Sequence, residues 1–153
     1  MGGYWHRQHA PLCLVLYALA VLFLILAVQL DEEPWLNYLF AACGLLVLVC
    51  AVAFHHLTVF DDGDGLAVRF GPLPLFRARV RYATIRDVAV DRSTLLEGLG
   101  IHLSPRGWIW NLWGRDCVAI RHTAGTFRVG TDEAMALADF LRTKIPPDSA
   151  SVV

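Results

Sequence analysis

Two long stretches near the start of the chain, residues 11–30 and residues 35–54, contain no charged side chain. A short turn with three acids and one proline, residues 31–34, separates them. Twenty helical residues extend about 30 Å, which matches the hydrocarbon core of a bilayer. The pattern therefore predicts two transmembrane helices, over residues 11–30 and 35–56, joined by a tight turn. The rest of the chain is then tethered to a membrane surface.

The charges that flank these stretches predict their orientation. Arg7 precedes the first stretch, the turn carries no base, and the first bases after the second stretch are Arg69, Arg77, Arg79 and Arg81. Basic residues are enriched on the cytoplasmic side of membrane proteins. We therefore expect both termini, with residues 1–10 and 57–153, to be cytoplasmic and the turn to face outward.

A cleaved signal peptide is the competing interpretation of the first stretch. The apolar run is longer than a usual signal core, and no small-x-small cleavage site closes it. A second apolar stretch also follows at once. These observations favour a retained membrane anchor.

The composition changes after the second stretch. Residues 57–153 hold twelve of the thirteen basic residues and eleven of the fourteen acids, mixed along the chain as on a soluble domain. The net charge of −1 indicates no bulk attraction to nucleic acid. The four cysteines form no CxxC pair or disulfide framework, so we interpret them as small apolar residues.

Short strand-like segments recur through this part of the chain. We expect six or seven antiparallel strands, because glycines and a turn interrupt residues 95–114. The turn signal at residues 61–65 joins the first two strands as a hairpin. The eight candidate segments from which these strands are drawn lie at residues 57–60, 66–70, 76–82, 85–91, 101–103, 108–110, 116–122 and 126–129.

An amphipathic helix is predicted to follow the strands. Thr131 is the expected N-cap, with Asp132 and Glu133 in the first turn. Arg142 and Lys144 fall in the last turn, two prolines at 146–147 end the helix, and residues 148–153 are expected to be disordered. A helix laid across a small sheet buries its open apolar face. The predicted fold for residues 57–145 is therefore an α+β barrel like that of pleckstrin-homology (PH) domains, or a generic α+β roll.

Three segments of the chain carry a family resemblance: LAVRFGP at residues 66–72, RGWIWN at 106–111 and FRVGTD at 127–132. They resemble a group of bacterial PH-like membrane proteins, in which two spans precede a cytoplasmic PH-like domain that ends in a (V/I)GTD turn and a helix. The resemblance extends from Leu12 to Ile145 and implies a multi-pass protein of the bacterial inner membrane, without implying an activity. Trp113 stands where a small or polar residue is expected, which indicates a loop with its own partner.

Arg77, Arg79 and Arg81 alternate with apolar residues and therefore share one face of the expected strand at residues 76–82. Such a row binds an acidic partner or anionic lipids, each base near a membrane adding about 1 kcal/mol. The alternative is a solvated face whose charges prevent edge-to-edge pairing of strands. Inositide recognition is not expected, because the hairpin at residues 61–65 carries three acids where inositide-binding PH domains carry bases.

The densest cluster of aromatic and basic residues lies between Arg106 and Arg115. Tryptophan favours membrane interfaces, so this loop is a candidate for resting the domain on the bilayer. The alternative is that Trp108 and Trp110 straddle the sheet, with one of them in the core. We expect Trp108 to be structural and Trp113 to lie at a surface. The candidate interaction residues are Arg77, Arg79, Arg81, Arg106, Trp110, Trp113 and Arg115.

No constellation of catalytic, metal or cofactor residues is recognised. His55 and His56 follow the second stretch, but adjacent side chains on a helix point about 100° apart and do not converge on one metal ion. His6 and His9 are spaced more like ligands, and a metal or haem site on them is the alternative interpretation. Such histidines more often mark the polar boundary of a span. No charge interrupts either stretch, which argues against a proton relay. We expect no enzyme activity, metal or cofactor.

The sequence thus favours a non-enzymatic adaptor or scaffold that presents a PH-like domain to a protein partner or to membrane lipids. One alternative is an accessory subunit of a larger membrane enzyme or transporter, with Cys43, Gly44 and Cys50 on a helix face packed against partner helices. Another is a sensor that holds a small apolar ligand in its barrel. Homo-oligomerisation is left open.

Overall fold

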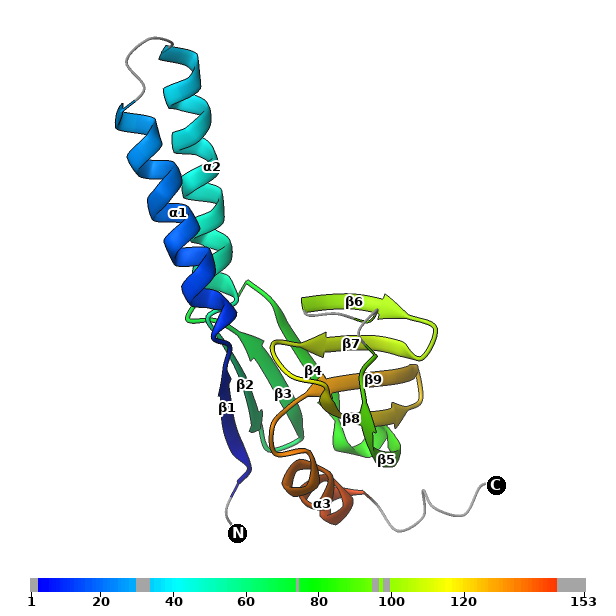
Figure 1. Ribbon diagram of the computed structural model, residues 1–153. Coiled ribbons are helices and arrows are strands. Elements are labelled where there is room, and N and C mark those ends of the chain that lie inside the picture. Colours follow the sequence, from blue (N-terminus) through cyan, green and yellow to red (C-terminus); the bar gives the residue numbers. More distant parts are fainter. Residues whose placement is uncertain (1–2, 30–33, 74, 95–96, 98–99, 146–153) are drawn as a thin grey trace.

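The computed structural model describes residues 3–29, 34–73, 75–94, 97 and 100–145 (Figure 1). A hairpin of two long helices, α1 (Leu12–Gln29) and α2 (Pro34–Ala53), projects from a domain built of two sheets and a third helix. The expected α+β class is confirmed. The helix α2 ends at Ala53, three residues before the predicted end, because His56 already belongs to a strand.

The side chains of both long helices have almost no protein cover. Cys13 and Ala20 are the buried described residues of α1, whereas large apolar side chains such as Leu14 and Leu46 are about two-thirds exposed. A core helix of a soluble protein would be mostly buried. Both helices are long and apolar enough to cross a membrane.

Gly44 lets α1 and α2 approach closely. A Cβ atom at this position would lie 2.9 Å from Leu24 Cγ and 3.3 Å from the Ala20 carbonyl oxygen. Small residues at such crossings allow helix backbones to pack in a lipid environment. The helix face at Gly44, expected to meet partner helices, is therefore occupied within the hairpin itself.

The first sheet continues directly from the helical hairpin. Its antiparallel order is β1-β2-β3-β4, with the strands β1 (Trp5–His9), β2 (His56–Asp61), β3 (Gly65–Phe70) and β4 (Arg77–Arg81). The last three strands and the turn at residues 61–65 match the prediction. The strand β1 was not predicted, because its polar sequence has no apolar alternation. It forms because α1 and α2 return to the same end of the hairpin and place β1 beside β2.

A short 3₁₀ helix, η1 (Tyr82–Thr84), leads to a second, five-stranded sheet of order β5-β8-β9-β7-β6. The strands β7 and β9 pair in parallel, so the expectation of a purely antiparallel sheet is wrong. Neither sheet closes into a barrel in the described part of the chain. The strands are β5 (Ile85–Arg92), β6 (Gly100–Ser104), β7 (Gly107–Asn111), β8 (Asp116–His122) and β9 (Gly125–Gly130).

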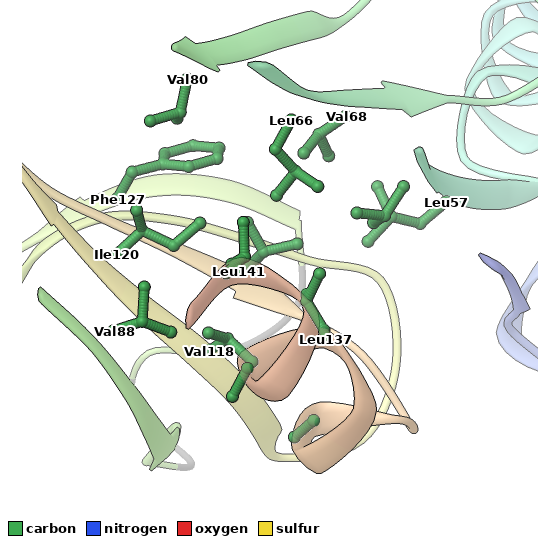
Figure 2. Packing of buried hydrophobic residues seen from close by; sticks show 14 of the residues in the cluster. Leu57, Leu66, Val68, Val80, Val88, Val118, Ile120, Phe127, Leu137 and Leu141 are labelled. Carbon is green, nitrogen blue, oxygen red and sulfur yellow. The ribbon is translucent and has the colours of Figure 1, made fainter. Parts of the chain in front are cut away.

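The core lies between the two sheets and the helix α3 (Ala134–Lys144), which packs on β5 and β8. Figure 2 shows Leu57 and Leu66 of the first sheet, Ile120 of the second sheet and Leu137 of α3 in this cluster. The apolar residues of α3 recur at intervals of three and four residues and face the core, as predicted. These buried positions are Ala134, Leu137, Ala138 and Leu141.

The start of α3 differs from the prediction. The helix begins at Ala134, and Glu133, not Thr131, occupies the N-cap position. The Thr131 hydroxyl instead accepts a hydrogen bond from the Glu133 backbone N–H at 3.1 Å. Asp132 and Glu133 lie before the first turn, where both carboxylates contact the His6 ring of β1. Arg142 and Lys144 occupy the last turn as predicted; the expected prolines at 146–147 and the tail lie outside the described residues.

A buried arginine of the second sheet binds Glu97, a residue from the chain between β5 and β6. These two strands form opposite edges of the sheet, and Glu97 lies between them in sequence. Its carboxylate accepts a 2.6 Å hydrogen bond from Arg128, which is fully buried on the central strand β9, and another of 2.6 Å from Arg106. Asp91 lies 2.9 Å from a second nitrogen of Arg128. The charge of Arg128 is thus balanced by two carboxylates.

The surroundings of Glu97 hold its carboxyl group ionised. Burial by itself raises the pKa of Glu97, but hydrogen bonds from the Thr94 backbone N–H and from the Arg106 and Arg128 side chains outweigh it. The pKa of Glu97 therefore lies well below its ordinary value. The resulting stability is present above the ordinary pKa of about 4.5 and is lost as the pH falls toward the folded-state pKa.

Glu97→Gln is expected to lower the free energy of unfolding by about 3 kcal/mol, because it leaves the buried Arg128 without its closest counter-charge. Denaturant unfolding of the full chain in detergent at pH 7 measures the loss. Below about pH 4.5 the wild type should lose this advantage progressively, so its free energy of unfolding approaches that of Glu97→Gln. The control is Asp87→Asn, whose exposed ion pair with Arg121 contributes little. Equal effects of the two substitutions would refute the account.

Candidate functional site

The outward face of the first sheet gathers basic and aromatic side chains from all four strands. Residues paired across strands share a face, and the rows can be followed through the register. One row comprises Trp5, Phe60, Ala67 and Arg79; the next, nearer the helices, comprises Arg7, Thr58, Arg69 and Arg77. We call this surface, together with Arg81 and the pair His9 and His56, the basic sheet face.

Five arginines lie on the basic sheet face, and all are exposed. The Arg79 guanidinium pairs with Asp62 at 3.1 Å. Within the described residues no ion pair joins the other four to a carboxylate. They are Arg7, Arg69, Arg77 and Arg81.

Two arginines of this face are positioned by aromatic rings. The guanidinium carbon of Arg69 lies 4.7 Å from the centre of the Phe60 ring, and that of Arg7 lies 5.2 Å from the Trp5 ring. Cation–π contacts at exposed sites contribute about 0.5–1 kcal/mol. They hold these charged groups close to the aromatic rings of the face.

Two shallow grooves divide the basic sheet face, and Arg69 lines both. The planar guanidinium group binds carboxylates with two parallel hydrogen bonds, so a surface of this kind is suited to an acidic, extended ligand. The first groove is lined by Trp5, Arg7, His56, Thr58, Phe60, Arg69, Gly71 and Pro72. The second is lined by Asp62, Ala67, Arg69, Arg77, Ala78 and Arg79.

The shared face of Arg77, Arg79 and Arg81 matches the sequence prediction, since each is exposed on the edge strand β4. Arg69 was missed as a member of this face, although its alternation with Val68 and Phe70 was a sufficient signal. Arg7 could not have been placed there, because its position depends on the unpredicted strand β1. The pairing of β1, β2 and β3 with β4 therefore extends the expected row of three arginines into the basic sheet face.

The second predicted cluster is not a single exposed patch. Trp110 packs on the core, with its ring centre 5.6 Å from Phe70 and 5.8 Å from Phe127. Trp108 is half exposed, so the expectation that it is the structural tryptophan is wrong. The two rings do not straddle the sheet, since residues two apart on a strand share a face and Ile109 between them is buried on the other.

The remaining members of this cluster contact the protein's own groups. Arg106 binds Glu97 and Asp91, and the Arg115 Nε donates a 3.1 Å hydrogen bond to the Ser93 carbonyl oxygen. Trp113 is exposed as expected, while its backbone carbonyl accepts a hydrogen bond from the Gln8 side chain. These contacts give each residue a structural role, in contrast to the unpaired arginines of the basic sheet face.

Three histidines meet where the helical hairpin joins the first sheet. The helix α2 has ended before His55, so the expected divergence of His55 and His56 on a helix does not apply, and both lie near His9. Burial lowers the pKa of His56, and the positive charge of Arg7, followed by His55 and His9, lowers it further. His6 is not part of this group, because it contacts Asp132 and Glu133.

An apolar hollow of about 220 Å³ lies at the base of the helices. It is not enclosed within the core, where a ligand was expected by the sensor hypothesis. Its lining combines the start of α1 with residues of the two-sheet domain: Ala10, Leu12, Cys13, Leu16, Phe54, Gly100 and Leu112.

A scan against protein-family models and a search of the curated proteins found no match for this chain.

Trp110→Ala is expected to cost about 3 kcal/mol in the free energy of unfolding, because it removes a ring that packs between Phe70 and Phe127. Trp113→Ala removes an exposed ring and should change stability by less than about 1 kcal/mol. Denaturant unfolding of both full-length variants in the same detergent tests this difference. Equal losses would show that Trp113 is as much a core residue as Trp110.

Proposed function

We propose that this chain is a non-enzymatic adaptor of a bacterial inner membrane, which binds an acidic segment of a protein partner on the basic sheet face. The observation that carries the proposal is the set of exposed arginines without carboxylate partners in the described residues, on a sheet whose strands β1 and β2 adjoin the helices. Electrostatic complementarity of this kind steers and orients a partner more than it adds affinity.

The direction of the strands favours a protein segment over the plane of lipid headgroups. The strands β1 and β2 run away from the ends of α1 and α2 (Figure 1). Along β1, Trp5 lies four residues farther from the helices than His9, a distance of about 13 Å at the rise per residue of a strand. This exceeds the Debye length of about 8 Å in physiological salt. Lipid headgroups therefore attract mainly the row nearer the helices, which contains Arg7, Arg69 and Arg77. An extended acidic segment that lies beside the sheet contacts every row.

The same proposal includes a PH-like module and a cytoplasmic location. Strands followed by a C-terminal helix that packs on β5 and β8 support the first. The second is supported by the positive-inside tendency: Arg7 and the arginines of β3 and β4 lie on the side of the helices opposite the acidic turn.

Cysteine labelling tests the cytoplasmic location. In a chain whose native cysteines are replaced, Ala83→Cys, at the exposed position of η1, should react with a membrane-impermeant maleimide only after the cells are permeabilised. The matched control, Glu33→Cys in the acidic turn between the helices, should react in intact cells. The opposite pattern would place the domain outside the cytoplasm and contradict the proposal.

Photo-crosslinking tests the partner. Replacement of Trp5, which is 61% exposed on the basic sheet face, by p-benzoylphenylalanine is expected to trap a protein partner in living cells. The adduct yield should fall about tenfold with Arg69→Ser/Arg77→Ser, since two exposed ion pairs contribute up to about 1 kcal/mol each and 1.4 kcal/mol is tenfold.

Two controls accompany this experiment. The same photoreactive residue at Trp108, half exposed on the second sheet, should not form the adduct. Arg86→Ser/Arg121→Ser removes two arginines from β5 and β8 and should leave the yield unchanged. If the adduct yield does not change with Arg69→Ser/Arg77→Ser, the basic sheet face is not the binding site. Adducts with lipid alone would favour the bilayer as the ligand of this face.

A further inference from the structure

The register of the first sheet sets two histidines directly opposite each other. His9, the last residue of β1, pairs with His56, the first residue of β2, so both imidazoles lie on the same face. His55 lies immediately before His56, in the bend that follows α2. The three ring centres are 5.8–5.9 Å apart, and one ring nitrogen of each residue lies within 4.8 Å of the others.

A metal centre requires the three ring nitrogens to approach one another somewhat further than this. Zinc binds histidine nitrogens at about 2.0–2.1 Å in tetrahedral geometry, which places the nitrogens roughly 3.3 Å apart. Because the His9 side chain is exposed, it has room to rotate toward the other two rings, which would shorten these distances. Three histidines leave a fourth position for water or another ligand.

A neighbouring hydroxyl holds one of the rings. The Tyr17 Oη of α1 lies 3.3 Å from His55 Nδ1. In the tautomer in which Nδ1–H donates to this oxygen, the lone pair of His55 Nε2 is available to a metal. Such outer contacts orient metal-bound histidines and fix their tautomer. The group therefore combines an exposed, a half-buried and a buried histidine, from β1, the bend and β2, with a positioning contact from α1.

We propose that His9, His55 and His56 form a site for a divalent transition metal of the Zn²⁺ type at the junction of the helices and the first sheet. Imidazole suits Zn²⁺, Co²⁺, Ni²⁺ and Cu²⁺, whereas Ca²⁺ and Mg²⁺ require oxygen ligands. The described ligand group contains no carboxylate. The positive charge of the nearby Arg7 repels a metal cation, but the three nitrogen ligands outweigh this single repulsion. The proposal does not depend on the partner assigned to the basic sheet face.

The bound metal has a structural consequence. It ties the end of β1 to the start of β2 where each strand meets its helix, and so it holds the polar edge strand β1 on the sheet. Metal that binds the folded state alone raises its stability by mass action. Residues 5–9 should therefore exchange their backbone amide hydrogens more slowly when metal is bound.

Cobalt binding to the full chain in detergent, purified with a tag that contains no histidine, tests the site. Wild type should show the visible absorption bands of tetrahedral Co²⁺, and Zn²⁺ should abolish them by competition. His9→Ala and His55→Ala should each weaken Co²⁺ binding by at least about 100-fold, the upper end of the cost of losing an outer-shell partner. The matched control His122→Ala lies in the β8 strand and should bind Co²⁺ like wild type.

A second readout separates metal binding from folding. Zn²⁺ should raise the melting temperature of the wild type and of His122→Ala, but not that of His9→Ala, and Mg²⁺ should raise none of them. Because His9 is exposed, its replacement is compatible with the fold, whereas the buried His56 is not needed for the test. The proposal is overturned if the wild type shows no tetrahedral Co²⁺ spectrum, or if His9→Ala binds Co²⁺ as tightly as the wild type.

Discussion

The uncovered apolar surface of α1 and α2 constrains the rest of the structure. Both helices are long and apolar enough to span a membrane, where lipid would cover their exposed side chains, and Gly44 lets them pack side by side. An antiparallel hairpin of this kind returns the chain to the same end. It therefore delivers residues 5–9 and 56–61 next to each other, where their backbone groups pair as β1 and β2.

Arginines serve two opposite purposes in this molecule. Arg128 is buried, and Glu97 and Asp91 balance its charge, so it contributes to the position of Glu97. The arginines of the basic sheet face are solvated, and most have no carboxylate partner in the part of the chain described. A buried charge without a partner is too costly to persist, whereas an exposed one keeps its hydration and remains available to a ligand.

The strand β1 links the two proposed sites. It contributes Arg7 to the basic sheet face and His9 to the histidine group, and in both cases the partner residues come from strands that lie far along the chain. An edge strand with a polar sequence contributes little apolar burial of its own. Its position depends on backbone pairing with β2 and on contacts such as those of His6 with Asp132 and Glu133.

The sequence by itself determined the features that depend on near neighbours. The apolar stretches, the alternation of Arg77, Arg79 and Arg81, and the helical spacing of Leu137 and Leu141 follow from local periodicity. Only the tertiary structure decided which elements meet. The strand β1, the burial of Trp110 in place of Trp108, and the approach of His9 to His55 depend on pairings between segments that are distant in sequence. The burial of Arg128 likewise depends on Glu97, 31 residues earlier, because a local pattern carries no information on what covers a strand.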